Sequence, residues 1–335
     1  MADFLKILDG ETLAQISVQF NYAEATADFV GLKLLPMAKT ENMKVAMYNL
    51  LKGSELPVIA LVHAFDSEAR IGDRPNYEEL KEELFLIKEK LNQGEELRKK
   101  IKDMGMPATE RTILNAIYDD IANLIAKVLT AFERRACEAL ATAKLVIDEN
   151  GAKRTVDYHL DSANKIDFVS WSTPSHDIFA DLAELRKASK NKIVRQIMSS
   201  KLFGYLMTNE KVLAYAEKLA VPVTDTLVKS YVSSTLGIEI IVDDRTYKTS
   251  YHSDKEYRFF PEDVVISLTT RGEVGKTFVT STPMEDANQG RQYGYVAVNQ
   301  WVTPDPYTSW TEAEGVGLPV IVDINNTLYL SKVTA

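Results

Sequence analysis

Residues 109–144 read TERTILNAIYDDIANLIAKVLTAFERRACEALATAK, and this stretch decides the fold. It contains neither Gly nor Pro, whereas the helix breakers Gly105 and Pro107 stand just before it. Apolar residues recur through it in steps of three or four, which places them on one face of an α-helix. These residues are Ile113, Ile117, Ile121, Leu124, Val128, Phe132, Ala136 and Leu140. Such a helix would be on the order of 54 Å long, about three times the usual length. This length is typical of an extended subunit that must be stiff.

The remaining faces of the predicted helix carry charged side chains, and we expect these faces to be surfaces that meet solvent or DNA. The residues are Glu110, Arg111, Asp119, Asp120, Lys127, Glu133, Arg134, Arg135 and Glu138. Cys137 lies beside the apolar stripe, so a buried thiol is predicted. Because it is the single cysteine of the chain, it excludes an internal disulfide and fits a reducing compartment.

The bulk properties of the chain exclude several classes of protein. Its 335 residues carry a formal net charge of -9, so adhesion to nucleic-acid phosphates or anionic membranes is not its main function. The longest uncharged apolar run, Leu56–Phe65, is about half the ~20 residues that a membrane span needs. The beginning, MADFLKILDG, lacks the basic start and long apolar core of a signal peptide.

A projecting β-hairpin is predicted before the long helix. The run Lys44–Leu50 meets a second apolar run, Leu56–Phe65, across a short link that contains Gly53 and Ser54, which is typical of a hairpin. The second run hardly alternates, so both of its faces need cover, and a lone hairpin in water is marginal. We therefore expect a neighbouring molecule to cover it. The candidate assembly contacts are Tyr48, Leu50, Leu56, Val58, Leu61, His63 and Phe65.

Residues 78–92 leave two alternatives open. Their many Glu and Lys residues favour a helix, whereas the apolar cluster Leu84–Ile87 also suits a strand. Beyond the long helix, two strand-like runs, Lys144–Ile147 and Thr155–Leu160, flank Asn150-Gly151. Asn-Gly between such runs is the strongest hairpin signal in the chain.

From about Ile166 the composition indicates a compact α+β unit. Ser175 is expected to cap a helix that has Asp177 in its first turn and continues to Leu185. Residues 247–257 are expected to form a long loop or a strand pair. Further helices are predicted at 209–220 and 224–234, the last stopped by Gly237, and strands at 238–242, 263–268, 276–281 and 295–302. A terminal pair of strands, 318–324 and 327–333, is expected to turn at Asn325-Asn326.

The segment Gly272–Thr277, GEVGKT, resembles part of a phosphate-binding loop but departs from it twice. The loop needs Gly where Thr270 stands, and it needs a helix afterwards so that the helix N-terminus faces the phosphates. A strand that ends at Pro283 follows instead. We therefore predict a turn between strands at 272–277, and nucleotide binding remains a remote alternative.

The other polar residues do not assemble a catalytic, metal or cofactor site. The four histidines, His63, His159, His176 and His252, share no metal-ligand spacing. His176 stands between Ser175 and Asp177, which favours a helix cap over a catalytic triad, because triads are assembled from separated positions.

Two charged clusters have a simple surface interpretation. Asp243-Asp244 with Asp254 favours a solvated acidic loop over a cation site. The basic residues of the second cluster either contact an acidic partner or keep the surface soluble; they are Arg186, Lys187, Lys190, Lys192 and Arg195.

Several segments spread over nearly the whole chain form an ordered set. They are Phe29–Gly31 with Leu35-Pro36; Leu56–Val58 with His63–Ala69 and Arg74; Glu133–Arg135 with Ala139–Leu145; Asn150-Gly151; Val156–Tyr158; Phe260–Val265; and Asp305-Pro306. Their ordered occurrence resembles a tailed-phage major capsid (head) protein of the lambda head protein type, which has the Hong Kong 97-type capsid fold.

The resemblance implies an α+β fold with five parts. They are an N-terminal arm (1–35), an extended β-hairpin loop (36–92), a peripheral domain (93–162) with the spine helix 109–144 and a hairpin, an axial domain (163–315), and C-terminal strands (316–335) that return to the peripheral domain. It also makes Glu83–Lys90 the returning strand of the loop, which we prefer over the helix because strand pairing overrides local propensity.

The resemblance implies a structural protein, not an enzyme, that needs no cofactor. Copies would form pentamers and hexamers of an icosahedral shell around double-stranded DNA, without sequence-specific binding or a membrane. Scaffolding, portal and decoration proteins would be partners. The protein would assemble in the host cytoplasm and would be located in the virion head. No motif here supports a Lys–Asn isopeptide cross-link between subunits. The alternative is a capsid-like compartment for protein cargo.

Overall fold

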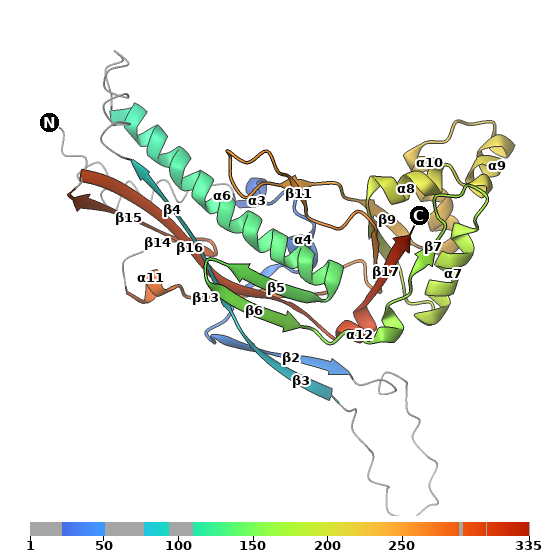
Figure 1. Ribbon diagram of the computed structural model, residues 1–335, viewed down its shortest axis with the longest axis horizontal. Coiled ribbons are helices and arrows are strands. Elements are labelled where there is room, and N and C mark those ends of the chain that lie inside the picture. Colours follow the sequence, from blue (N-terminus) through green and yellow to red (C-terminus); the bar gives the residue numbers. More distant parts are fainter. Residues whose placement is uncertain (1–21, 51–76, 94–109, 288–290, 306, 335) are drawn as a thin grey trace, which may run out of the picture. The chain divides into compact units, whose positions relative to one another are not determined.

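The computed structural model describes residues 22–50, 77–93, 110–287, 291–305 and 307–334 (Figure 1). The chain divides into two compact units. Unit 1 consists of Met1–Val45, Glu83–Ala136 and Lys276–Pro319, and unit 2 consists of Ala46–Glu82, Cys137–Gly275 and Val320–Ala335. Each unit therefore gathers segments that are far apart in the sequence.

Unit 1 is a sheet that packs against a long helix. The sheet order is β1-β13-β16-β15-β14, and β4 also pairs with β16. The strands are β1 (Met37–Lys39), β4 (Phe85–Gln93), β13 (Gly275–Thr280), β14 (Arg291–Tyr293), β15 (Val296–Pro304) and β16 (Tyr307–Ile321). The helices are α3 (Tyr22–Ala25), α4 (Gly31–Leu34), α6 (Glu110–Thr142, which continues into unit 2) and α11 (Pro283–Asp286).

Helix α6 confirms the predicted long helix, and its apolar stripe is its buried face. The predicted stripe residues whose side chains are described are all buried; they are Ile121, Leu124, Val128, Phe132, Ala136 and Leu140. Cys137 is buried as expected. The glycines of β16 allow the close approach of the sheet, because a Cβ at Gly315 or Gly317 would lie within 2.8 Å of the Phe132 ring.

The prediction that every charged face of α6 meets solvent or DNA is wrong. Glu133 is fully buried and Arg135 is 6% exposed, and Ile125 and Leu129 beside the stripe are also fully buried. The physical reason is that the helix is covered on more than one side. The N-terminal segment around α4 packs on it in addition to the sheet, as the Glu133 contacts described below demonstrate.

Residues 77–93 form strands, so the helix favoured by local propensity is wrong and the returning strand is confirmed. β3 (Tyr77–Glu83) alternates inward and outward residues, and β4 pairs with β16 from Phe85↔Gly317 to Gln93↔Ser309. A ladder of this length outweighs the weak helix preference of Glu and Lys.

Strand β2 (Lys44–Leu50) pairs with β3. The sequence predicted Leu56–Phe65 as its partner, and that segment lies outside the described residues. Val45 and Met47 are buried on one side of β2, in keeping with a strand period of two. The two strands thus flank residues 51–76, which lie outside the described residues.

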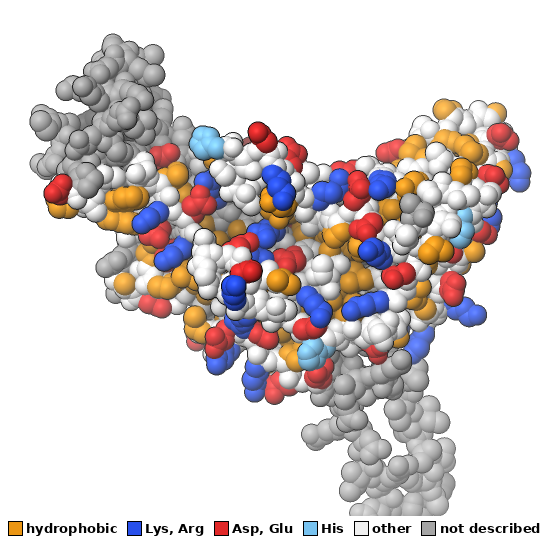
Figure 2. All heavy atoms as spheres, in the orientation of Figure 1, with side chains coloured by type: hydrophobic (Ala, Val, Ile, Leu, Met, Phe, Trp, Pro, Cys, Tyr) orange, Lys and Arg blue, Asp and Glu red, His pale blue; other side chains and the backbone are white. Residues whose placement is uncertain are grey.

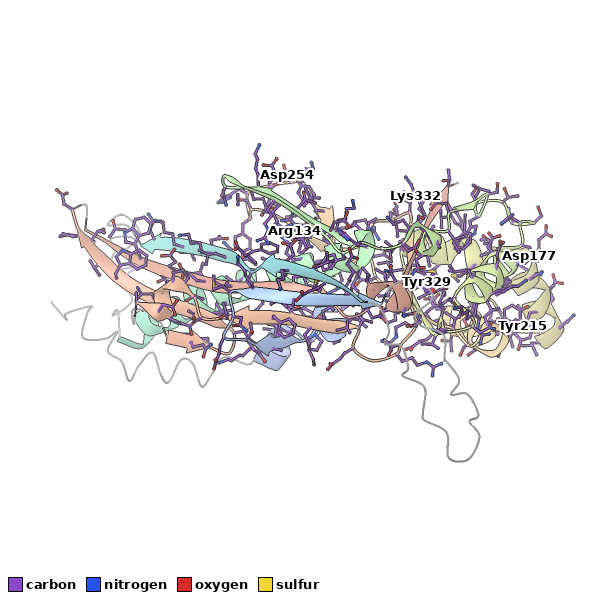
Figure 3. The ribbon with its side chains drawn as sticks, turned by 90° about the horizontal axis from the view of Figure 1, so that it is seen from below. Arg134, Asp177, Tyr215, Asp254, Tyr329 and Lys332 are labelled. Atoms are coloured by element: carbon purple, nitrogen blue, oxygen red, sulfur yellow. The ribbon has the colours of Figure 1, made fainter. Side chains whose placement is uncertain are left out.

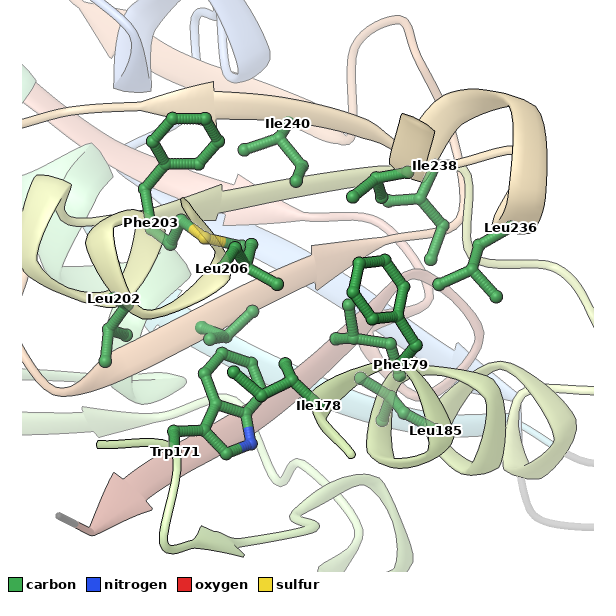
Figure 4. Close-up of a cluster of buried hydrophobic side chains, with 14 of the residues drawn as sticks. Trp171, Ile178, Phe179, Leu185, Leu202, Phe203, Leu206, Leu236, Ile238 and Ile240 are labelled. Carbon is green, nitrogen blue, oxygen red and sulfur yellow. The ribbon is translucent and has the colours of Figure 1, made fainter. Parts of the chain in front are cut away.

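Unit 2 contains a five-stranded sheet in the order β7-β17-β12-β8-β9. Its strands are β7 (Phe168–Val169), β8 (Arg195–Met198), β9 (Glu239–Val242), β12 (Val264–Leu268) and β17 (Leu328–Thr334). Helices α7 (Ile178–Ala188), α8 (Ser200–Met207), α9 (Glu210–Leu219) and α10 (Asp225–Leu236) accompany it, with a short 3-10 turn at Ser162–Asn164 and α12 (Ile324–Thr327). Trp171, Phe179 and Phe203 belong to the apolar cluster between these elements (Figure 4).

Two small strand pairs in unit 2 confirm sequence predictions. β5 (Lys144–Glu149) pairs with β6 (Ala152–Asp157), and both Asn150 (φ 49°) and Gly151 (φ 84°) are left-handed, as the predicted tight turn needs. β10 (Thr246–Tyr247) pairs with β11 (Tyr257–Arg258). The helices predicted at 209–220 and 224–234 are α9 and α10, and Gly237 (φ 68°) ends the latter.

Helix α7 begins later than predicted. The cap is Asp177, whose carboxylate accepts a hydrogen bond from the Ala180 N–H, and not Ser175. Residues before it form turns instead, in which the His176 N–H donates to the Thr173 carbonyl. The cap therefore lies two residues later than predicted, because a turn precedes the helix.

The predicted pairing of the last two strands is wrong. α12, with Asp323 in a left-handed conformation (φ 48°), separates β16 from β17, and the two strands join different sheets. β17 pairs with β12 and β7, which fall in the segment 163–315, and does not return to the hairpin 144–160. Conversely, β14–β16 lie in the sheet packed on α6. A boundary at 315 therefore does not match the strand pairing.

Candidate functional site: assembly surfaces

The segments that resembled enzyme motifs have structural roles. Residues 269–274 connect β12 to β13, which confirms a connection between strands, although Gly275–Thr277 of the predicted turn belong to β13. No helix follows, so the geometry of a phosphate-binding loop is not formed here. His176 Nε2 lies 2.8 Å from Asp181 Oδ2, and the same oxygen accepts from Trp171 Nε1 at 2.8 Å. The Asp181 carboxylate therefore binds a histidine and a core tryptophan to α7. This group contains no hydroxyl side chain that could act as the nucleophile of a catalytic triad.

The acidic cluster is paired with arginines. Asp243 forms a two-pronged ion pair with Arg245, and Asp244 pairs with Arg258 and accepts from the Ser200 N–H. Asp254 lies on the separate β10–β11 loop (Figure 3). Burial would raise the pKa of Asp244, but hydrogen bonds from Ser200 and Arg258 lower it overall. In the described ranges no group of three His, Cys, Asp or Glu residues is arranged to hold a metal ion.

No helix in the described part of the chain combines the length and the apolar character that a membrane crossing requires.

The first structured surface is the point where the N-terminal segment docks on α6. The Glu133 carboxylate accepts hydrogen bonds from the backbone N–H groups of Val30, Gly31 and Leu32, at 2.8, 2.9 and 2.7 Å. These are the orphan donors at the beginning of α4, which a buried carboxylate satisfies well. Leu35 continues the contact, because its carbonyl accepts from the Thr277 hydroxyl of β13. Glu133 thus holds the beginning of α4 on α6.

The second surface is the contact of β3 with the β5–β6 hairpin in unit 2. Glu78 and Glu82 lie on the same side of β3, and each meets a basic side chain near β6. Glu78 Oε1 lies 2.8 Å from His159 Nδ1, and Glu82 pairs with Arg154. These pairs attach β3 to the β5–β6 hairpin and to the residues just after it.

The predicted assembly contacts are placed only in part. Tyr48 and Leu50 belong to β2, and their side chains are not described. The other five, Leu56, Val58, Leu61, His63 and Phe65, lie outside the described residues. The role of these seven residues therefore stays a prediction.

A third surface lies on α9 and the turn after it. Leu213, Leu219 and Val221 are exposed there, and Figure 2 shows hydrophobic side chains over α9 and α10. Tyr215 lies on the same helix (Figure 3) and its ring contacts Tyr231 of α10. Exposed apolar residues that gather in this way are typical of a protein–protein contact.

Sequence reasoning missed Glu133, Glu78 and Glu82 as positioning residues. The partners of Glu133 are 101–103 residues away along the sequence, so no local sequence pattern predicts them. A signal did exist for β3, because Glu78, Leu80 and Glu82 follow a period of two once the segment is considered as a strand.

Solved structures with the same fold are capsid-related. A protein assigned as a prophage capsid protein from E. coli CFT073 matches with a TM-score of 0.62 at 15% identity, over 97% of this chain and 99% of that chain. A phage-related protein from Bordetella bronchiseptica RB50 matches with a TM-score of 0.57 at 12% identity, over 96% of each chain. No curated protein matches the sequence significantly.

These findings define the class of the protein: a structural shell protein, not an enzyme, with the Hong Kong 97-type capsid fold. The family follows from the sequence itself, since the family model of phage major capsid protein E matches residues 12–330. The chain belongs to the phage major capsid protein E family. It is a shell-forming capsid protein that associates with its own copies.

Proposed function

We propose that this chain forms pentamers and hexamers that close into an icosahedral shell around packaged double-stranded DNA of a tailed bacteriophage. The observation that carries the proposal is the family match over residues 12–330, on a fold whose loop strands β2 and β3 are paired and anchored. A shell of many copies needs subunits whose extensions leave from fixed points, and the Glu133 and Glu82 contacts supply two such points.

The parts of the chain take the following roles. Residues 1–35 are the arm, and 36–92 form the extended loop that lies over an adjacent subunit, with Tyr48–Phe65 among its contacts. Helix α6 is the spine of the peripheral domain. The five-stranded unit with α7–α10 is the axial domain, and its exposed residues on α9 meet other copies near the centre of each ring.

The remaining partners follow from the same role. The net charge of -9 keeps the lining from adhering to DNA, so the contact with the genome is not sequence-specific. Scaffolding and portal proteins act during assembly in the host cytoplasm, and a decoration protein is a further candidate partner. The mature location is the virion head.

Negative-stain microscopy of the expressed chain, with and without a scaffolding protein, tests this function. We expect closed, even-sized particles. If every condition yields small monomers alone, the shell role is wrong. Nucleic acid in particles recovered from infected cells supports the phage head, whereas protein cargo supports the alternative compartment.

A deletion tests the assignment of the extended loop. Removing residues 51–55 shortens the excursion between β2 and β3 without touching the Glu82–Arg154 anchor. We expect a soluble, folded protein, judged by its circular dichroism, that no longer closes into shells. Normal particles from this variant would refute the loop assignment.

A further inference from the structure

The sheet of unit 1 has a second face, on the side away from α6. The register pairs Lys88 with Glu314 and Lys90 with Glu312, so the even-numbered side chains of β4 and β16 share one face. The odd-numbered positions Gly315 and Gly317 face Phe132 of α6. In Figure 1, α11 lies on the other side of this sheet from α6. The face therefore carries charged and aromatic groups and meets the short helix α11 rather than α6.

A cavity of about 630 Å³ opens on this face beside α11. Its walls include the two carboxylate residues Glu312 and Glu314, the indole of Trp301, the amide of Asn299, and Pro283 with Met284. Trp301 stacks on Trp310 at a centroid distance of 6.4 Å, which holds its ring in place. Two acidic side chains beside a fixed aromatic ring form a suitable surface for a planar cation.

Glu314 is the unusual member of this cavity. Its side chain is 6% exposed, and its Oε2 atom has no hydrogen-bond partner among the described residues. Burial and the neighbouring charge of Glu312 raise its pKa, whereas the Met284 backbone, Lys88 and Thr282 lower it less. The carboxylate accepts hydrogen bonds from the Met284 N–H and from the Thr282 side chain, but its buried Oε2 has no donor, and a buried acceptor without a partner is costly.

The positive groups on the same face do not supply that donor. Lys88 is opposite Glu314 in register, yet no ion pair joins them in the part of the chain that the structure describes. Lys90 lies over the Trp310 ring, with Nζ 4.7 Å from the centroid. By contrast, Glu89 on the opposite face pairs with Lys127 of α6. The carboxylate oxygen without a donor therefore belongs to Glu314, which lines the cavity.

We propose that this cavity receives an arginine side chain from a second copy of this chain, with Glu314 and Glu312 as acceptors and Trp301 stacked on the guanidinium. The inference rests on the shell role, because assembly brings a second copy to every subunit. A guanidinium supplies several donors in one plane and stacks on an indole, which a lysine does less well. A buried acceptor that is unpaired in the free subunit is then satisfied at the interface.

The first test uses Glu314→Gln, which keeps the shape of the side chain and removes its charge. We expect the melting temperature of the unassembled subunit to be unchanged or higher, because a buried carboxylate is no longer desolvated. We expect the subunit concentration needed for assembly to rise about tenfold, the effect of losing one buried charged contact per interface. Glu89→Gln, on the other face of the same sheet, is the matched control and should assemble normally.

The second test uses L-argininamide as a probe, with glycinamide at the same ionic strength as the control. Millimolar L-argininamide should slow assembly of the wild-type chain more than glycinamide does, and this excess should vanish in Glu314→Gln. Normal assembly of Glu314→Gln, or an excess that persists in it, would overturn the proposal while leaving the shell role intact. Failure of the wild-type chain to assemble would instead contradict the shell role.

Discussion

At the scale of single residues, Glu133 has the largest predicted effect on stability. Its carboxylate accepts hydrogen bonds from three backbone N–H groups at the beginning of α4, which have no partner within that helix. Leaving buried donors unsatisfied costs ~1–3 kcal/mol each, so Glu133→Ala should lower the free energy of unfolding by more than ~3 kcal/mol. The free energy of unfolding of Glu133→Gln, which keeps one acceptor oxygen, should lie between those of the wild type and Glu133→Ala. Denaturant unfolding measures both.

Glu138→Ala is the control for this prediction. Glu138 lies on the same helix, and among its contacts is an exposed hydrogen bond accepted from the Val146 N–H at 2.8 Å. We expect a loss below ~1.5 kcal/mol, the usual net value of one hydrogen bond. Equal losses at Glu133 and Glu138 would contradict the arm-docking role. The sequence could not reveal this role, because the partners of Glu133 are more than one hundred residues away.

A second prediction for single residues concerns the stability of Ala variants at Gly315 and Gly317. A Cβ at Gly315 would lie 2.7 Å from the Phe132 ring and meet only side chains, whereas one at Gly317 would also lie 2.8 Å from the Phe278 carbonyl oxygen. Both Ala variants should be destabilised by ~1–3 kcal/mol. Adding Phe132→Leu should rescue Gly315→Ala but not Gly317→Ala, since a backbone atom cannot move aside as a side chain can. Thermal unfolding of the double variants distinguishes the two sites.

At the scale of elements, helix α7 should make unit 2 sensitive to acid. The Lys211 ammonium lowers the pKa of Asp177, more than burial raises it, and the Ala180 N–H also lowers it. A carboxyl with a lowered folded-state pKa stabilises the fold above its unfolded value, which is 3.8. This stabilisation is lost as the pH falls through the folded pKa, so the window lies below about pH 4.

Asp177→Asn isolates that effect, because Asn remains a good helix cap. At neutral pH the variant should lose less than ~1 kcal/mol, as is usual for an exposed ion pair. The difference from the wild type should shrink as the pH falls below about 4. Asp254→Asn, on the β10–β11 loop, is the control. If the difference in stability between the wild type and Asp177→Asn grows as the pH falls, the predicted direction of the pH dependence is wrong.

The elements themselves show which parts of the fold a sequence can predict. α6, the Asn150-Gly151 hairpin and the end of α10 at Gly237 follow from local periodicity and turn chemistry, and all three are confirmed. β4 and β17 were harder, because their partners β16 and β12 lie far along the chain. Pairing over such distances is decided by the assembled sheet and not by the propensity of the segment.

At the scale of the whole molecule, the net charge of -9 bears on association between copies. Like-charged subunits repel over about one Debye length, which is ~30 Å at 0.01 M salt and ~8 Å at 0.15 M. Raising NaCl through this range should therefore lower the concentration needed for assembly. A contact that is largely buried, such as the proposed one at Glu314, is screened much less and should not reverse the trend.

Surface neutralisation checks this explanation. The triple variant Glu184→Gln, Glu217→Gln and Asp254→Asn removes three exposed carboxylates that form no ion pair in the described structure. It should assemble at lower salt than the wild type, with a weaker salt dependence followed by light scattering. If both proteins respond identically to NaCl, net repulsion does not govern assembly. A yield that falls as salt rises would instead show that exposed ion pairs between copies outweigh the repulsion of the whole subunits.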